Sequence, residues 1–319
     1  SMGANVIALS DLLSDYENVL ESVYACNIPT KAGEIPAISY EGGVTVSAPA
    51  VKTAKPRVLI PVFPGTNCEY DSAKAFADAG AEPEIVVINN LSAAGISASA
   101  ESFAKKIGES QIIFIPGGFS GGDEPDGSGK FITAFFRNAG VREAATALLD
   151  NRGGLMAGIC NGFQALVKLG LVPFGEIIDM ADDAPTLTFN TIARHQSMMV
   201  TTRIASNKSP WLYGCEVGDI HTIPISHGEG RFVAPDRIIQ QMANNGQIAT
   251  QYVDLDGNPT MDIRYNPNTS VEAIEGITSP DGRVLGKMGH SERIGSFIGK
   301  NVPGSKDQKI FESGVAYFK

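Results

Sequence analysis

Cys160 stands at the centre of the pentapeptide GICNG, with a glycine two positions away on either side. The pentapeptide lies where an apolar run, 153–160, gives way to a helical pattern. A nucleophile on a sharp strand-to-helix turn needs such glycines, because they let neighbouring segments pack closely. The helix N-terminus would favour thiolate over thiol, and the N–H of Asn161 would point toward a forming oxyanion. A buried cysteine between packing glycines is the alternative explanation.

A nucleophilic thiol needs a base, and the base needs a third group that fixes its tautomer. The segment GHSER places His290 and Glu292 two positions apart, after an apolar run. The segment HGEGRF offers His227 and Glu229 at the same spacing, so it is the strongest rival. The other two histidines are His195 and His221. These residues alone do not choose the base, and a solvated surface cluster would explain either pair.

The glycine-rich segment PGGFSGGDEPDGSGK covers residues 116–130 and follows another apolar run. It is therefore expected at the same carboxyl edge of a parallel sheet as Cys160, where ligands bind in open α/β folds. Consecutive glycines free the backbone to present N–H groups to an oxyanion, and this shared edge favours that role for Gly118. A flexible surface loop is the alternative.

The elements that must position these residues alternate between strands and helices. Strands are expected at 57–63, 84–89, 111–116 and 153–160, and helices at 68–80, 98–108, 130–151 and from Asn161 to a stop at Gly170. Shorter strands follow, including SMMVTTRI, QIATQYV, IRYN and VEAIEGITS, with a hairpin turn at Asp256–Gly257. Strands that are apolar throughout indicate an open, mostly parallel, doubly wound sheet, the flavodoxin-like class of fold.

Composition narrows the class of protein. The 319 residues carry a net charge of −10, which argues against nucleic-acid binding, and the longest apolar runs are too short to cross a bilayer. Four cysteines without a CxxC spacing indicate neither a disulfide framework nor a zinc site, and predict a cytoplasmic protein.

Residues 5–25 have the period of an amphipathic helix, and 27–55 read as a connector. We therefore divide the chain into 1–55 and a main domain, 56–319.

The segments GICNGFQ, PGGFS and GHSER, in this order, resemble the class I glutamine amidotransferases. The longer segments FPGTNCEYDSAKAFADAGAEPEIV, PGGFSGGDEPDGSGKFI, RHQSMMV and HGEGRF are similar to the glutaminase domains of phosphoribosylformylglycinamidine synthases, enzymes of purine biosynthesis. The resemblance covers roughly residues 56–300.

This resemblance implies a role for each matching residue. Cys160 would attack the glutamine amide, His290 would be the base and Glu292 would orient it, which releases ammonia by way of a γ-glutamyl thioester. The residues expected to hold the oxyanion and to seat the glutamine are Gly117, Gly118, Phe119, Asn161, Gln164 and His227. The resemblance implies no cofactor in this chain and a synthetase domain or subunit as partner, with ATP and Mg²⁺ used there.

Two departures and two alternatives accompany the resemblance. The family often has proline between the histidine and the glutamate, where this chain has Ser291, and no segment resembles the ATP-using synthetase. Residues 1–55 would then be the tail of a synthetase region and a linker. The alternatives are another cysteine hydrolase of the same fold, such as a γ-glutamyl hydrolase or a protease-like enzyme, and an inactive regulatory subunit.

Overall fold

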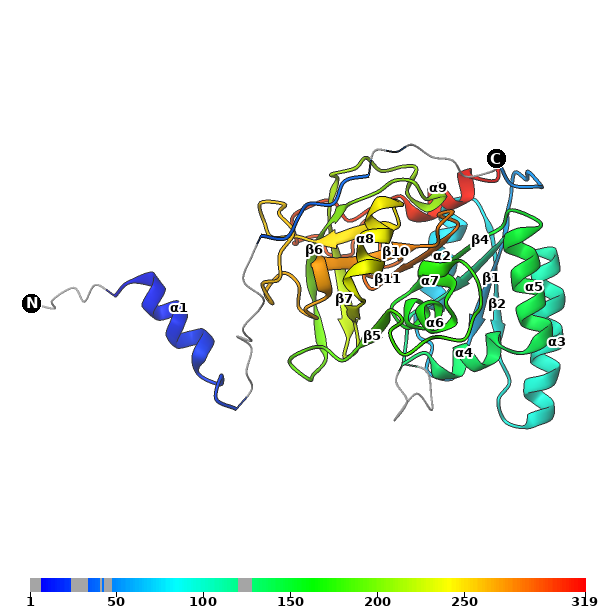
Figure 1. Ribbon diagram of the computed structural model, residues 1–319, viewed down its shortest axis with the longest axis horizontal. Coiled ribbons are helices and arrows are strands. Elements are labelled where there is room, and N and C mark those ends of the chain that lie inside the picture. Colours follow the sequence, from blue (N-terminus) through cyan, green and yellow to red (C-terminus); the bar gives the residue numbers. More distant parts are fainter. Residues whose placement is uncertain (1–6, 24–33, 41, 43–47, 120–127) are drawn as a thin grey trace, which may run out of the picture.

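The computed structural model describes residues 7–23, 34–40, 42, 48–119 and 128–319, so most of the glycine-rich segment expected at 116–130 lies outside the described residues. Its largest element is a nine-stranded sheet with helices packed against it (Figure 1). In spatial order the strands are β2 (Glu82–Val87), β1 (Arg57–Val62), β3 (Ile112–Ile115), β4 (Leu155–Ile159), β11 (Val284–Lys287), β10 (Ile274–Thr278), β9 (Ile248–Tyr252), β6 (Gln196–Ile204) and β7 (Ile220–His227).

The sheet has a parallel and an antiparallel half that meet at β11. Every neighbouring pair from β2 to β11 is parallel, whereas every pair from β11 to β7 is antiparallel. The expected α/β class is confirmed, and the antiparallel half is built from the later short strands. Because β4 and β11 are adjacent and parallel, with Ile159 opposite Lys287, the segments that follow them leave the sheet at one edge.

Helices other than α1 cover this sheet, whereas α1 stands away from it (Figure 1). Helix α2 contacts β1 and β2, and α6 contacts β4 and β11. The helices are α1 (Leu9–Asn18), α2 (Glu69–Asp78), α3 (Ala93–Glu109), α4 (Lys130–Phe136), α5 (Ala139–Asp150), α6 (Asn161–Leu169), α7 (Leu171–Phe174), α8 (Asp236–Asn244) and α9 (Ile310–Ala316), with 3₁₀ turns η1 (Pro210–Leu212) and η2 (Val271–Ala273). Strands β5 (Thr186–Thr188) and β8 (Arg231–Val233) form a separate small sheet.

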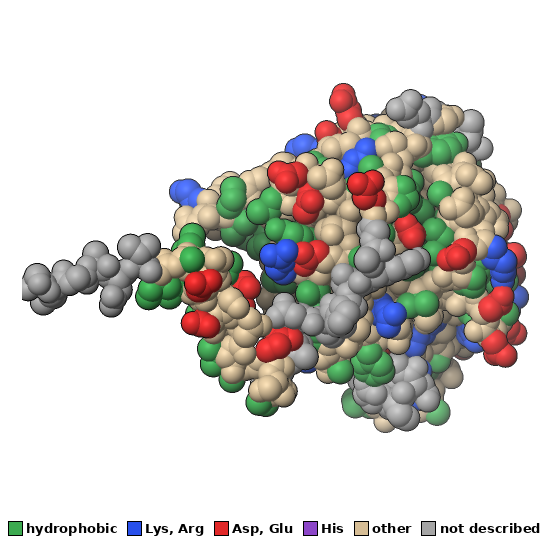
Figure 2. Space-filling model, turned by 60° about the vertical axis from the view of Figure 1, so that its left-hand side comes forward, with side chains coloured by type: hydrophobic (Ala, Val, Ile, Leu, Met, Phe, Trp, Pro, Cys, Tyr) green, Lys and Arg blue, Asp and Glu red, His purple; other side chains and the backbone are tan. Residues whose placement is uncertain are grey.

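Helix α1 lies within the expected helix at 5–25, yet it has no buried residue. Its apolar side chains include Leu9 and Tyr16, which are 81% and 82% exposed. Figure 2 shows hydrophobic and acidic side chains side by side along this part of the chain. Among the described residues, no helix is both long and apolar enough to span a membrane.

Two expectations about local structure are wrong. The single helix expected over 130–151 is two helices, α4 and α5, because Asn138 caps the second one by accepting hydrogen bonds from the N–H groups of Gly140 and Val141. The expected strand IRYN, 263–266, is a series of turns, in which Asp262 accepts a hydrogen bond from the N–H of Arg264. The hairpin at Asp256–Gly257 is confirmed by a bridge between Val253 and Pro259.

The turn between β4 and α6 depends on Gly158 and Gly162. A Cβ atom added at Gly162 would lie 2.1 Å from the carbonyl oxygen of Ile115 in β3, and one added at Gly158 would lie 2.6 Å from the backbone carbon of Gly162. Both obstacles are backbone atoms, which cannot rotate away as a flexible side chain can. Both glycines therefore meet the requirement for close packing that the pentapeptide predicts.

We expect Gly162→Ala to destabilise the protein, because the methyl group collides with the backbone of a central strand. Overpacking of this kind costs about 3 kcal/mol or more, a fall in Tm of roughly 5–10 °C. The matched control is Gly108→Ala in α3, where an added Cβ meets nothing within 4 Å. It should leave Tm unchanged or raise it. Thermal unfolding followed by circular dichroism compares the two, and equal Tm values would contradict the prediction.

Candidate active site

Cys160 occupies the residue between β4 and α6, with φ 54° and ψ −108°. A non-glycine residue in this region of backbone space costs about 1–3 kcal/mol, and such strain is typical of functional sites. Two hydrogen bonds hold the strained residue, because its N–H donates to the carbonyl of Lys287 at 2.9 Å and its carbonyl accepts from the N–H of Gln164 at 3.0 Å. The side chain is 4% exposed. The turn therefore fixes the thiol at the edge of the sheet.

His290 and Glu292 form the buried pair that the sequence motif GHSER predicts. Their Nδ1 and Oε1 atoms are 2.6 Å apart, and both side chains are almost fully buried. A Cβ atom added at Gly117 would lie 2.7 Å from Cε1 of His290 and 3.3 Å from Cβ of Cys160. The imidazole and the cysteine therefore meet across Gly117. Nε2 of His290 has no hydrogen-bond partner within the described structure, so this nitrogen remains available to a thiol proton.

The pKa values of His290 and Glu292 are shifted in opposite directions. Burial alone would lower the pKa of His290, but the negative charge of Glu292 and the nearby sulfur atoms of Cys160 and Cys68 raise this pKa well above 6.5. Burial likewise opposes the charged form of Glu292, while the charge of His290 and the hydrogen bond between them lower the pKa of this carboxyl group. The pair thus favours an imidazolium beside a carboxylate.

His227 does not form the equivalent pair, although its sequence spacing is the same. Its Nδ1 lies 3.2 Å from the side-chain oxygen of Asn190, while Glu229 accepts a hydrogen bond from the N–H of Ser128 at 3.0 Å. Burial lowers the pKa of His227 to about 3, with contributions from His290 and His195. The rival base therefore lacks its carboxylate and stays neutral.

Gly118 and Phe119, two of the residues expected to hold the oxyanion, lie against the loop that follows β1. The N–H of Phe119 donates to the carbonyl of Gly65 at 2.9 Å, and its ring is 56% exposed. Gly118 has φ 148°, and a Cβ atom there would lie 2.4 Å from the same carbonyl oxygen. Because its N–H is engaged, Phe119 does not offer this donor to an oxyanion in the observed arrangement.

Gln164 and Asn161, on the first turn of α6, are buried and joined to each other. The side-chain nitrogen of Asn161 donates to Oε1 of Gln164 at 3.1 Å, and Nε2 of Gln164 donates to the carbonyl of Glu229. Gln164 therefore connects the nucleophile's helix to the turn after His227. Its amide group is used within the protein and does not reach toward an open site.

A buried ion pair holds the loop that carries His290. Nζ of Lys287 lies 3.2 Å from Oε1 of Glu275 and donates to the carbonyl of Gly289 and to the hydroxyl of Ser291. The same carboxylate accepts from the N–H of Gly289 at 2.6 Å. Ser291 in turn donates to Oε1 of Gln308 at 2.6 Å. Where the family often has proline, hydrogen bonds of Ser291 restrain the loop instead.

No motif in the sequence predicted that Cys68 would lie at this site. Its sulfur lies 3.8 Å from Nδ1 of His290 and accepts a hydrogen bond from Nη2 of Arg293 at 3.3 Å. Cys68 and His290 are distant in the chain and share no motif spacing. A signal was present only in the position of Cys68 at the start of the helix that follows β1, at the same sheet edge as Cys160.

Comparisons with known proteins agree with this geometry. A family model described as a CobB/CobQ-like glutamine amidotransferase domain matches residues 55–318. The phosphoribosylformylglycinamidine synthase subunit PurQ of Methanococcus maripaludis is 37% identical over 239 residues, 75% of this chain and 82% of that protein. The PurQ subunit of Salinibacter ruber is 31% identical over 263 residues, 81% and 94% of the two chains.

A solved structure has the same fold. A chain in the structure of PurLQS from Thermotoga maritima superposes with a TM-score of 0.60 and 27% identity, and covers 83% of this chain and 100% of that one. The match of the family model over residues 55–318 includes the β4–α6 turn and the segment after β11.

We expect two of the buried histidines, His227 and His290, to titrate on opposite sides of pH 6.5. His227 should remain neutral down to about pH 3, because its burial disfavours the charged form. His290 should remain protonated well above pH 6.5, and Glu292→Gln should lower its pKa by removing the carboxylate charge. The Cε1–H signals in NMR spectra recorded across this range test both directions. A His290 signal unaffected by Glu292→Gln would contradict this account.

We also expect Lys287→Met to destabilise the protein by about 3–5 kcal/mol, because it leaves the buried Glu275 carboxylate unpaired. The double variant Lys287→Met with Glu275→Gln removes both charges and should recover part of that loss. Urea unfolding of the parent and the variants gives the comparison. If the single and double variants lost equal stability, the ion pair would not be the restraint described.

Proposed function

The chain belongs to the CobB/CobQ-like glutamine amidotransferase family, and on that premise we propose that it hydrolyses L-glutamine with Cys160, His290 and Glu292 as a catalytic triad. The observation that carries this assignment is the buried Nδ1–Oε1 contact of 2.6 Å beside the strained turn of Cys160. A nucleophile, a base and an orienting carboxylate are the three groups that acyl transfer of this kind needs.

In the first half of the reaction, the proton of the Cys160 thiol is held on Nε2 of His290 while the sulfur attacks the side-chain amide carbon of glutamine. Backbone N–H groups of Gly118 and Asn161 stabilise the oxyanion. As the intermediate collapses, the C–N bond breaks and His290 gives its proton to the leaving nitrogen. Ammonia departs, and a γ-glutamyl thioester remains on Cys160.

In the second half, His290 takes a proton from water as the water oxygen attacks the thioester carbon. The C–S bond then breaks, glutamate leaves, and the proton returns to the Cys160 sulfur. Glu292 holds Nδ1 throughout, so Nε2 always faces the reacting atoms. The raised pKa of His290 supports this role, because it stabilises the imidazolium that holds the proton while the sulfur attacks.

Gln164 and His227 act indirectly in this scheme. Gln164 is hydrogen-bonded to the carbonyl of Glu229, and His227 is paired with Asn190. Both are buried, so they shape the turn at 227–230 that would border the glutamine. We therefore assign them to the shape of the glutamine pocket, and assign its direct backbone contacts to Gly117 and Gly118.

The ammonia serves the ATP-dependent formation of formylglycinamidine ribonucleotide in purine biosynthesis, and the partner that uses it is the synthetase domain or subunit of phosphoribosylformylglycinamidine synthase. This part of the proposal is supported by the PurQ relatives and by the likeness to a chain of PurLQS. ATP and Mg²⁺ belong to the partner, and this chain needs no cofactor for hydrolysis. The match of the family model over 55–318 supports an amidotransferase in preference to a γ-glutamyl hydrolase.

A complex rebuilt with Cys160→Ala should make no product from glutamine but should still make product from a concentrated ammonium salt. The thiol takes no part in the synthetase step, and free ammonia replaces the ammonia made from glutamine. Product formation with ammonium should rise with pH, because ammonia and not ammonium is the nucleophile. Product is measured from both nitrogen donors in the parent and variant complexes.

The matched control is Cys215→Ala, which removes another buried thiol whose sulfur donates to the carbonyl of Gln308. That variant should use glutamine as the parent does. Glutamine-dependent product from the Cys160→Ala complex within tenfold of the parent would remove Cys160 as the nucleophile. Failure of an assembled Cys160→Ala complex to use ammonium would show that the thiol matters beyond hydrolysis.

A further inference from the structure

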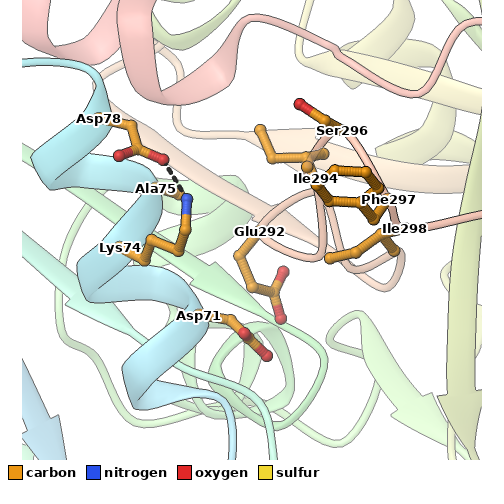
Figure 3. A pocket seen from close by; sticks show the side chains of 10 residues that line it. Asp71, Lys74, Ala75, Asp78, Glu292, Ile294, Ser296, Phe297 and Ile298 are labelled. Atoms are coloured by element: carbon orange, nitrogen blue, oxygen red, sulfur yellow. Dashed lines mark hydrogen bonds and ion pairs between the residues drawn. The ribbon is translucent and has the colours of Figure 1, made fainter.

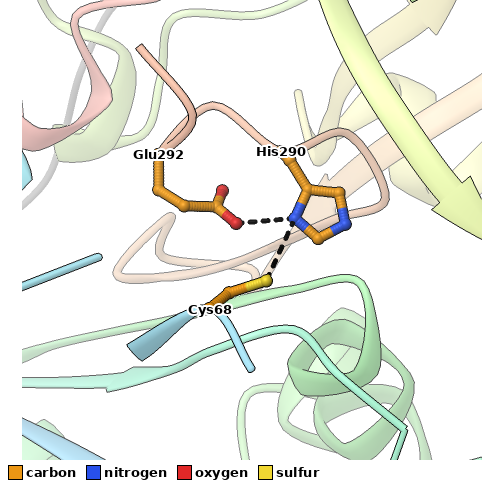
Figure 4. A group of neighbouring side chains, drawn as sticks. All are labelled: Cys68, His290 and Glu292. Carbon is orange, nitrogen blue, oxygen red and sulfur yellow. Dashed lines mark hydrogen bonds and ion pairs between the residues drawn. The ribbon is translucent and has the colours of Figure 1, made fainter. Parts of the chain in front are cut away.

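Cys68 brings a second thiol to the triad, and the mechanism above leaves it without a role. One donor atom from each of Cys68, His290 and Glu292 lies within 4.8 Å of the other two, and all three side chains are buried (Figure 4). The shortest contact of the sulfur with the imidazole is 3.8 Å, to Nδ1. Figure 4 shows the thiol and the carboxylate both directed at that nitrogen.

These three donors form a ligand set that suits zinc. Thiolate, imidazole and carboxylate bind Zn²⁺ at about 2.0–2.3 Å, so tetrahedral ligand atoms lie roughly 3–4 Å apart. The sulfur and Nδ1 already have this separation, whereas Nδ1 and Oε1 of Glu292 would have to separate from 2.6 Å. Oε2 of Glu292 is buried without a hydrogen-bond partner among the described residues, so a second carboxylate oxygen is available. A buried oxygen without a partner calls for an explanation, and a cation supplies one.

The Cys68 sulfur is already hydrogen-bonded to neighbouring side chains. Nη2 of Arg293 donates to it at 3.3 Å. Hydrogen bonds of this type also support metal-bound ligands from outside the coordination sphere. The thiol itself donates to the side-chain oxygen of Asn67 at 3.2 Å, and this hydrogen bond is lost on deprotonation. Bound through a Cys68 thiolate and the Glu292 carboxylate, Zn²⁺ would have its two positive charges balanced.

A cavity of about 360 Å³ is lined in part by Glu292. It lies between α2, which contributes Asp71 and Asp78, and the segment with Phe297 and Ile298 (Figure 3). Lys74 of α2 also lines this cavity and is paired with Asp78, which leaves Asp71 to attract a cation. The Glu292 side chain is itself 0% exposed, so a metal ion that enters from this cavity reaches the triad only when that side chain moves.

We propose that Cys68, His290 and Glu292 form a zinc site and that zinc bound there switches off glutamine hydrolysis. The ion replaces the proton on Nδ1 of His290 and the proton of the Cys68 thiol, and both protons pass to solvent. Nε2 of His290 then keeps its own proton and cannot accept one from Cys160. Sequence spacing predicted no metal, because these ligands come from segments far apart in the chain. The proposal that zinc binds here does not depend on the proposed function, whereas the proposal that zinc inhibits hydrolysis rests on it.

Cobalt is the probe for binding, because a thiolate bound to Co²⁺ gives a charge-transfer absorption band that a ligand set without sulfur lacks. The full chain is titrated with Co²⁺ in a Cys26→Ser background, and Zn²⁺ is then added in competition. We expect one equivalent of Co²⁺, the charge-transfer band and its displacement by zinc. Cys68→Ser should abolish the band and weaken zinc binding by roughly 100-fold or more, since even the outer-shell partners of zinc ligands contribute about 10–100-fold.

Two control variants locate the site. Cys215→Ser removes a buried thiol outside the cluster, and Cys160→Ala removes the nucleophile; both should keep the band and bind zinc within a few fold of the parent. Circular dichroism verifies that each variant is folded. Absence of the band in the parent, its persistence in Cys68→Ser, or its loss in Cys160→Ala would each overturn the proposal.

Inhibition is tested separately, in the complex with the synthetase partner. Zinc at the concentration that displaces Co²⁺ should abolish glutamine-dependent product, and a chelator should restore it. Cys68→Ser should require roughly 100-fold more zinc for half-inhibition of its own activity. Zinc binding at Cys68 in a chain without glutaminase activity would refute the proposed function alone. Unimpaired turnover by a zinc-saturated complex would refute the inhibitory site alone.

Discussion

The ion pair between Lys287 and Glu275 is the interaction on which the arrangement of the active site depends. Lys287 is the last residue of β11. Its ammonium group donates hydrogen bonds to Gly289 and Ser291, the two residues on either side of His290. Its carbonyl also receives the N–H of Cys160. One residue therefore fixes the base through its side chain and the nucleophile through its backbone. A buried ion pair contributes little net stability when compared with apolar packing, so specific positioning is the better explanation for its presence.

The strain at Cys160 is tolerated because the structure around it leaves no alternative. Gly158 and Gly162 let β3, β4 and α6 approach so closely that the chain must turn sharply between them. Hydrogen bonds to the strained residue from both sides then offset the cost of its backbone conformation. The thiol is held where the histidine can reach it, and packing, not flexibility, brings the two together.

The sequence predicts most of the parallel half of the sheet, because apolar strands bounded by glycines leave a periodic pattern. It also predicts Cys160, since the elbow is a local feature. The break between α4 and α5 was missed, because it depends on a single side-chain cap at Asn138. Which of His290 and His227 is the base cannot be predicted from local sequence. Both have a glutamate two residues on, but tertiary packing pairs one with its carboxylate and the other with Asn190.

The meeting of the parallel and antiparallel halves at β11 has a consequence for synthesis of the chain. The elbow with Cys160 is made from β3, β4 and α6, whereas the base follows a strand that pairs with β4 only after the whole antiparallel half has been translated. Contacts so distant in sequence form late, because loop closure must precede them. A chain still emerging from the ribosome, or one truncated before β11, therefore presents the thiol without the imidazole. The topology keeps the incomplete protein from consuming glutamine.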